Sequence, residues 1–169
     1  MSTTTVILPD YPDGPVPGFP GDLADIGLKD TISRSNTGTT PISFGAAVVD
    51  GVPNAASTSA DPGCQTFNGT GRVIGFAKSD YSLRPIVGGL GGNITQPPLA
   101  YQPGDMVQVI ADGRMRVFAD ADVLAGADVY VDATGNVTVT ATGTTKVGDA
   151  TWETSTKAGH VGIIQILMH

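Results

Sequence analysis

Two copies of one short pattern in the second half of the chain constrain its fold more than any other feature. GDMVQVIADGRMRV (residues 104–117) aligns without a gap on GADVYVDATGNVTV (residues 126–139), and a pattern repeated with matched turns indicates a structural repeat. In each copy, alternating apolar and polar residues reach a glycine turn, at Asp112-Gly113 or Gly135-Asn136, and a second alternating run follows. This arrangement is typical of a β-hairpin. The sequence therefore predicts a duplicated hairpin.

The two copies place their apolar residues at equivalent positions. The matched pairs are Val107 with Val129, Val109 with Val131, Met115 with Val137, and Val117 with Val139. Because side chains alternate between the two faces of a strand, each predicted hairpin has one apolar face, and the two faces can close on one core.

Length and composition favour a single β domain. With 169 residues, the chain has the length of one domain with appendages. Charged residues make up 15% and aromatic residues 6%, while 23 glycines and 12 prolines lie mostly between the apolar runs. This composition favours strands joined by many turns over helices. We expect a mainly β protein, a compact antiparallel β-barrel or sandwich.

Composition also argues against several function classes. The net charge of −7 lacks the concentrated basic surface of a nucleic-acid-binding protein. The single cysteine, Cys64, excludes an intrachain disulfide and leaves zinc sites of the CxxC kind without ligands. No stretch approaches the roughly 20 apolar residues of a membrane span, and the N-terminus lacks an export signal. We therefore expect a soluble protein made in the cytosol that binds neither nucleic acid nor a membrane.

The first 27 residues differ from the rest and predict an extended N-terminal arm. Five prolines alternate there with glycines and large apolar residues: Pro9, Pro12, Pro15, Pro17 and Pro20. Proline fixes φ and lacks an amide donor, so neither a helix nor a central strand fits. A disordered tail is the alternative, but a solvated tail does not need large apolar side chains.

Free-energy estimates indicate that such an arm needs a surface to lie on. Ordering about 20 residues costs roughly 1–2 kcal/mol each, and burying about 1,000 Å² of apolar surface returns about 25 kcal/mol. Because the two terms nearly cancel, the arm would be ordered only against a neighbouring surface. The predicted organisation is an arm at 1–27 and a single β domain at 28–169, with a long loop at 79–102.

Within that domain, the pattern predicts further strands and loops. Strands are expected at 28–36, 42–49, 64–67, 72–77 and 159–167, loops at 54–63 and 143–157, and a turn or short helix at 120–125.

No residue pattern predicts catalysis, a cofactor or a metal. The glycine-rich stretch 88–92 lacks the Lys and Ser/Thr of a phosphate-binding loop, so conformational freedom explains it better. The acidic residues Asp120, Asp122, Asp128 and Asp132 lack the spacing of a calcium-binding loop and are better explained as solvated carboxylates. Nothing beyond residue type pairs Cys64 or a serine with His160. The sequence indicates a protein that is not an enzyme.

Four blocks of the sequence together resemble the structural cement (head decoration) proteins of tailed bacteriophages. The blocks are FPGDLAD (residues 19–25) leading through ISRSN to ISFGAAVVDG, then GRVIGFAKSDYS (71–82), then the repeated pair, and finally WETSTKAGHVGIIQI (152–166). The resemblance covers most of residues 19–167, but neither the first 18 residues nor the stretch 84–98.

The resemblance implies a function in the virion. It implies a β-barrel or sandwich, commonly trimeric, that binds the major capsid protein lattice on the capsid exterior where capsomers meet and stabilises the head. Synthesis would take place in the host cytoplasm. On this hypothesis the contact residues are Tyr11, Phe19 and Leu23, with Trp152 a further candidate that could equally be a core residue.

One alternative of a different class stays open. A surface-displayed β-module that binds carbohydrate or a host receptor would use the long loops and exposed aromatic residues such as Tyr81 and Tyr101.

Overall fold

The computed structural model describes residues 19–24, 29–51, 63–80 and 100–168. All regular elements of these ranges are strands, in agreement with the predicted β class. The strands are β1 (Asp30–Ser35), β2 (Ile42–Ser43), β3 (Ala47–Asp50), β4 (Cys64–Thr66), β5 (Val73–Ala77), β6 (Ala100–Tyr101), β7 (Met106–Phe118), β8 (Asp128–Val131), β9 (Val137–Thr138), β10 (Thr145–Trp152) and β11 (Val161–Leu167). The described part of the chain contains no helix that could span a membrane.

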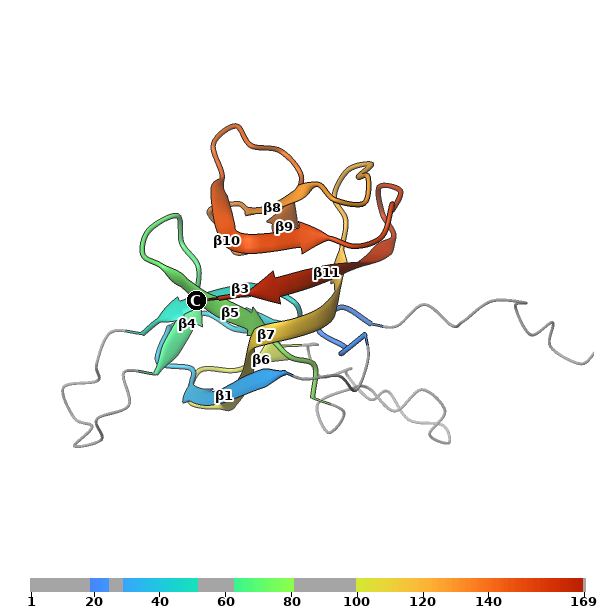
Figure 1. The fold of residues 1–169 in the computed structure, drawn as a ribbon. Coiled ribbons are helices and arrows are strands. Elements are labelled where there is room, and N and C mark those ends of the chain that lie inside the picture. The colour runs from blue at the N-terminus through green and yellow to red at the C-terminus, as the bar shows by residue number, and fades with distance from the viewer. Residues whose placement is uncertain (1–18, 25–28, 52–62, 81–99, 169) are drawn as a thin grey trace, which may run out of the picture.

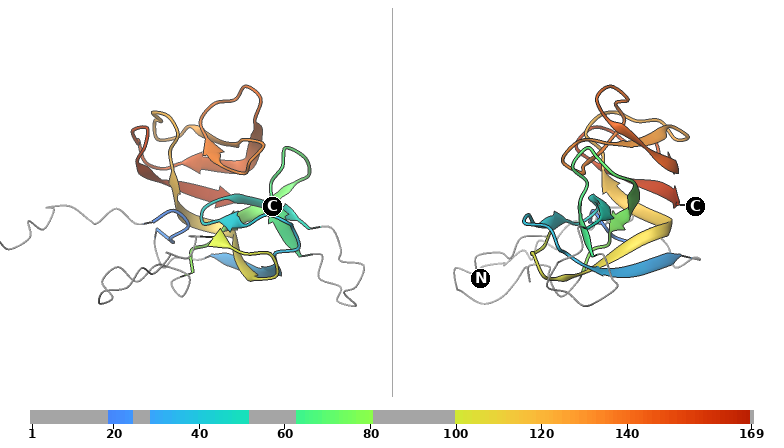
Figure 2. Two further views of the ribbon diagram at one scale, coloured as in Figure 1. Left: turned by 180° about the vertical axis from the view of Figure 1, so that it is seen from behind. Right: turned by 90° about the vertical axis from the view of Figure 1, so that its left-hand side faces the viewer.

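Nine strands form one antiparallel sheet that curls into a half-barrel (Figures 1 and 2). Its order is β4-β3-β5-β7-β11-β10-β8-β9, and β1 also pairs with β7. A separate two-stranded sheet is formed by β2 and β6. The curl brings the turn between β8 and β9 onto β3, where the Ala47 amide donates to the Gly135 carbonyl at 2.8 Å.

The long strand β7 connects the two halves of the half-barrel. Its first half pairs with β1, from Met106 to Asp112, and its second half pairs with β11, from Asp112 to Phe118. The hairpin predicted for the first copy of the repeat is therefore wrong, because Gly113 lies within a continuous strand of 13 residues. The second copy is the predicted hairpin, with β8 paired to β9 around the turn at Gly135.

Seven of the eight matched apolar positions of the repeat are buried and Val139 is half-buried, but they pack around two cores and not around one. The inner core lies inside the half-barrel and includes Met115 and Val117 together with residues of β8 to β11. The outer core lies on the other face of β3, β5 and β7 and includes Val107 and Val109. The small sheet of β2 and β6 contributes Ile42 and Tyr101 to this outer core. The middle of the large sheet is therefore buried on both faces.

The strand β10 was missed, because residues 143–157 were predicted as a loop. The sequence hides the strand because its buried residues, Val147, Ala150 and Trp152, do not alternate regularly. Gly148 has φ of 37°, and the pairing of β10 with β8 shifts register between Lys146 and Thr151. An irregularity of this kind breaks the two-residue period on which strand prediction depends.

The other predicted elements agree more closely with the structure. Strands lie within 28–36, 64–67, 72–77 and 159–167, as expected. The strand predicted at 42–49 is divided into β2 and β3 by a turn at Gly45, whose φ is 79°. Residues 120–125 form no helix but contain a bridge between Val123 and Thr156. The loop predicted at 54–63 lies outside the described residues apart from Gly63.

Candidate interaction surface

The N-terminal anchor, residues 19–24, begins with a tight turn at Phe19-Pro20-Gly21-Asp22. The Asp22 amide donates to the Phe19 carbonyl at 3.0 Å, and the Phe19 amide donates to Asp22 Oδ2 at 3.0 Å. Gly21 has φ of 84°. Proline at the second position and a glycine with positive φ at the third are the preferences of a type II turn, so the letters FPGD dictate this local structure.

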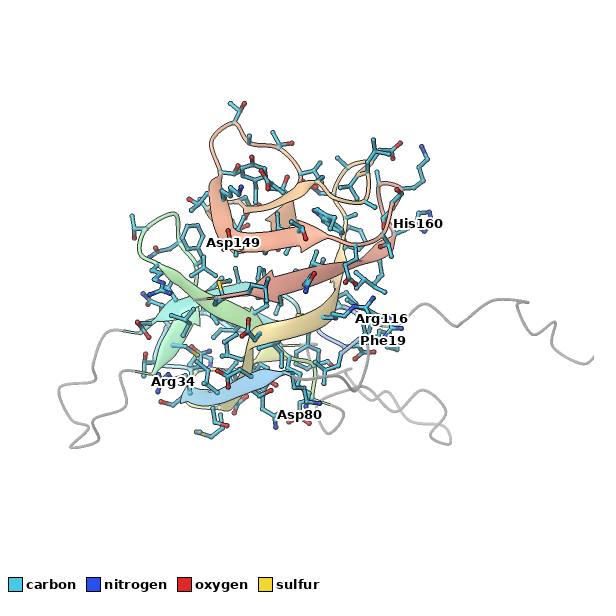
Figure 3. All side chains as sticks on the ribbon, in the orientation of Figure 1. Phe19, Arg34, Asp80, Arg116, Asp149 and His160 are labelled. Atoms are coloured by element: carbon cyan, nitrogen blue, oxygen red, sulfur yellow. The ribbon has the colours of Figure 1, made fainter. Side chains whose placement is uncertain are left out.

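The anchor pairs with β7 on the edge opposite β11. The Gly21 amide donates to the Arg116 carbonyl at 2.8 Å, the Arg116 amide donates to the Asp22 carbonyl at 2.8 Å, and the Ala24 amide donates to the Arg114 carbonyl at 2.9 Å. Leu23 thereby forms a bridge with Met115. Figure 3 labels both Phe19 and Arg116 in this part of the molecule. Three backbone hydrogen bonds thus join the anchor to β7 through an isolated β-bridge.

Contacts with Ser79 and with the Arg116 side chain strengthen this attachment. Ser79, which is 3% exposed, donates from its hydroxyl to Asp22 Oδ1 at 2.5 Å and from its amide to the Gly21 carbonyl at 2.8 Å. Arg116 Nη1 donates to the Leu23 carbonyl at 2.8 Å. Hydrogen bonds to an ionised carboxylate are stronger than neutral ones. The described part of the predicted arm is thus packed on the domain, while residues 1–18 and 25–27 lie outside the described residues.

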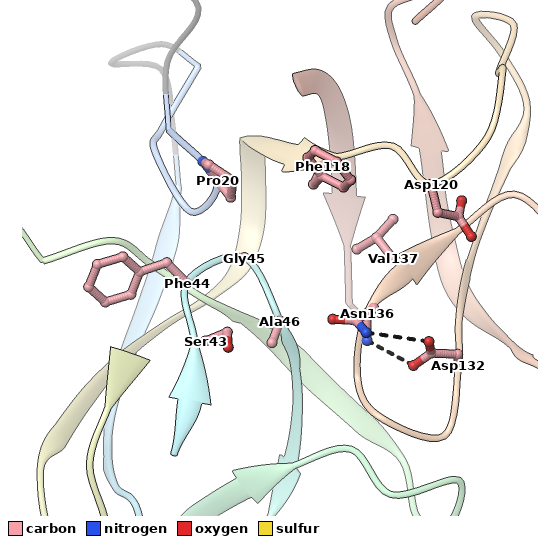
Figure 4. Close-up of a pocket in the computed structure, with 10 residues that line it drawn as sticks. All are labelled: Pro20, Ser43, Phe44, Gly45, Ala46, Phe118, Asp120, Asp132, Asn136 and Val137. Carbon is pink, nitrogen blue, oxygen red and sulfur yellow. Dashed lines mark hydrogen bonds between the residues drawn. The ribbon is translucent and has the colours of Figure 1, made fainter. Parts of the chain in front are cut away.

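A groove of about 300 Å³ borders the anchor (Figure 4). Four segments line it: the anchor, the turn between β2 and β3, the end of β7, and the turn between β8 and β9. The lining residues are Pro20, Ser43, Phe44, Gly45, Ala46, Phe118, Asp120, Asp132, Asn136 and Val137. Residues far apart in the sequence therefore meet at one place on the surface.

The structure distributes the four predicted contact residues differently. Phe19 is 53% exposed, whereas Leu23 is half-buried and packs against the inner core. Trp152 is 1% exposed and lies in the inner core, where it offers no surface to a partner. Tyr11 lies outside the described residues. Of the three described residues, only Phe19 presents a largely exposed aromatic ring.

Sequence reasoning missed Phe118, which is 50% exposed and lines the groove. Exposed aromatic rings are enriched among the residues that carry binding energy at interfaces. The alternation along β7 could have predicted this exposure. Met115 and Val117 point into the inner core, so Phe118, the next residue, points to the opposite face of the strand.

Three of the four acidic residues near the repeat, Asp122, Asp128 and Asp132, have partners of their own. Asp122 forms an ion pair with Lys157 at 2.5 Å, and Asp128 forms one with Lys146 at 2.9 Å. Asp132 Oδ1 accepts from the amides of Thr134 and Asn136, at 2.8 and 3.0 Å. Among the described residues, no group of three or more His, Cys, Asp or Glu is placed to hold a metal ion.

Comparison with known proteins identifies the family. The model of the family described as "Structural cement protein (E217 gp24/Pam3 gp6)" matches residues 7–167. The chain belongs to this structural cement protein family. Membership gives it a structural role in a phage capsid and places it in the virion.

The fold of this cement protein also has a counterpart among solved structures. A chain from "The capsid of Myoviridae Phage XM1" superposes with a TM-score of 0.61 at 18% identity, covering 99% of this chain and 98% of that one. At that identity the likeness shows a shared fold. A search of curated proteins gave no match.

Proposed function

We propose that this protein binds the major capsid protein on the exterior of the head, at the junctions between capsomers, and stabilises the lattice there. It acts as a homo-oligomer, with a trimer the expected form, after synthesis in the host cytoplasm. Its function is binding and not catalysis. Family membership supports the capsid role.

The observation that carries this proposal is the anchor. Its hydrogen bonds to β7 and Ser79 fix the point at which residues 1–18 join the domain, at Phe19 with its exposed ring. A segment attached to a rigid domain gains effective concentration at a second contact, and an oligomer presents several such segments at once. We therefore assign capsid attachment to residues 1–18 together with the surface around Phe19.

The alternative, a carbohydrate-binding or receptor-binding module, receives no support from its described residue. Tyr101 is 1% exposed, and its hydroxyl donates to the Lys78 carbonyl at 2.7 Å. Burial raises the pKa of this hydroxyl to about 12. Tyr81 lies outside the described residues.

Deleting residues 1–18 tests the role of the N-terminal segment. The truncated chain begins at Phe19 and keeps the whole anchor, so its thermal unfolding should stay close to that of the full chain. We expect its affinity for isolated heads that lack this protein to fall at least about tenfold, which corresponds to about 1.4 kcal/mol of lost contact free energy. Co-sedimentation with the heads measures this.

Two controls make the deletion interpretable. Circular dichroism and the unfolding temperature report whether the truncated domain is folded. A chain with residues 1–18 replaced by a Gly/Ser linker of equal length separates the effect of their side chains from that of chain length. Full occupancy by the truncated chain would contradict the assignment.

A further inference from the structure

The groove beside the anchor combines apolar and acidic surface. Phe118, Pro20 and Val137 supply apolar surface, and Asp120 and Asp132 supply two carboxylates. None of the ten lining residues is Lys or Arg. The described lining of the groove therefore carries negative charge with no cation among its residues to neutralise it.

The two carboxylates differ in their availability. Asp132 is engaged by the turn that it closes. Partial burial raises the pKa of Asp132, but the hydrogen bonds from Thr134 and Asn136 outweigh burial and leave this pKa below its usual value. Asp132 therefore remains ionised at neutral pH while its oxygens stay committed to the turn.

Asp120 is the carboxylate that a partner could engage. It is exposed, and no hydrogen bond or ion pair joins its side chain to another described residue. Asp122, two residues later, is paired with Lys157 outside the groove lining. In Figure 4, Asp120 lies beyond the ring of Phe118, on the side away from Pro20.

Backbone contacts hold the walls of the groove in place. The Gly45 amide donates to the Ala77 carbonyl at 2.7 Å, which fixes the turn between β2 and β3. A Cβ atom on Gly45 would lie 3.1 Å from the Gly21 amide nitrogen, so this turn packs directly on the anchor. The turn between β8 and β9, which forms the opposite wall, is held by the hydrogen bond from the Ala47 amide to the Gly135 carbonyl. A preformed groove loses little entropy when it binds a ligand.

We propose that this groove receives a lysine or arginine side chain from an extended segment of the capsid protein. The aliphatic stem packs on Phe118 and Pro20, and the cationic head reaches Asp120. The stem gains by covering apolar surface while the cationic head gains beside the carboxylate. This inference rests on the proposed capsid function and specifies the chemistry of the partner.

Size and charge favour this occupant. A volume of about 300 Å³ is at the lower limit of small-molecule sites, and it suits one long side chain. The net charge of −7 for the whole chain favours a basic partner surface over an acidic one. A second copy of this chain would bring the same negative charge to the groove.

Binding of full-length variants to heads that lack this protein tests the proposal. We expect Asp120→Asn to weaken binding about tenfold and Phe118→Ala to weaken it by about tenfold or more, whereas Asp122→Asn should bind like the unaltered protein. Because salt screens the proposed ion pair, the affinity of the unaltered protein should fall more steeply with NaCl concentration than that of Asp120→Asn. Light scattering measures the oligomeric state of each variant in solution.

The outcomes distinguish a failure of the proposed capsid function from a failure of the proposed basic partner. If the unaltered protein does not bind the heads, the proposed function itself fails. If the unaltered protein binds the heads and Asp120→Asn has the same affinity and the same salt dependence, the inference that the groove binds a basic side chain is wrong. A change of oligomeric state in Asp120→Asn or Phe118→Ala would assign the groove to contact between copies and overturn the inference as well.

Discussion

Replacing Gly75 with alanine is expected to lower the free energy of unfolding by about 2–5 kcal/mol, the sum of backbone strain and overpacking. Gly75 has φ of 153°, a conformation that L residues rarely adopt. A Cβ atom there would lie 2.3 Å from the Ile110 carbonyl oxygen and 2.7 Å from Val109 Cγ1. Both obstacles belong to β7, where it pairs with β5, so the strand that joins the two halves of the half-barrel would have to move.

Gly104→Ala is the matched control for this substitution. Gly104 also has a positive φ, 91°, but apart from its chain neighbours no described residue places an atom within 4 Å of the position of its Cβ. Only backbone strain remains, so we expect a cost of about 1 kcal/mol. Chemical unfolding of both variants measures the difference. Equal losses would contradict the close approach of β5 to β7.

Truncating Trp152 to alanine is expected to cost about 3–5 kcal/mol of stability, because it removes the largest side chain of the inner core. The ring is tightly enclosed, since a Cβ atom on Gly162 would lie 2.8 Å from Trp152 Cζ3. Its indole nitrogen is buried without a hydrogen-bond partner among the described residues. Trp152→Phe should therefore cost less, because it keeps a ring and removes an unsatisfied donor.

The same pair of variants distinguishes a core residue from a contact residue. Urea unfolding of the isolated protein should show the loss of stability, and the folded fraction of Trp152→Phe should bind heads like the unaltered chain. Leu124→Ala, at a position that is 75% exposed, provides a surface control with an expected effect within about 0.5 kcal/mol. Weakened head binding by Trp152→Phe without a loss of stability would return Trp152 to the interface.

The alternation of apolar and polar residues along the strands was a reliable guide to which residues are buried. It was a poor guide to how the strands pair and connect. The period of two correctly predicted the burial of Val107, Val109, Met115 and Val117. The same letters suggested a turn at Asp112-Gly113, because a glycine after an aspartate suits a hairpin as well as a bent strand. Long-range pairing with β1 and β11 decides between the two, and local sequence does not contain that information.

The candidate surface was harder to predict because it is assembled from distant segments. FPGD predicts a turn by itself, yet its attachment depends on Ser79 and Arg116, which no local pattern links to it. The groove joins residues from Pro20 to Val137. Trp152 was chosen as a possible contact because tryptophan suits both cores and interfaces, and only the packing around its ring shows that it is buried.

Electron cryomicroscopy of purified virions of the phage that encodes this chain would test directly whether the protein binds the exterior of the head. We expect density for the half-barrel on the outer surface of the head at the junctions between capsomers, with residues 1–18 extending from Phe19 onto the capsid protein. We also expect the number of copies on each head to match the number of equivalent positions that the local symmetry of these junctions provides. Absence of the chain from the particle, or density confined to the head interior or the tail, would contradict the proposed binding.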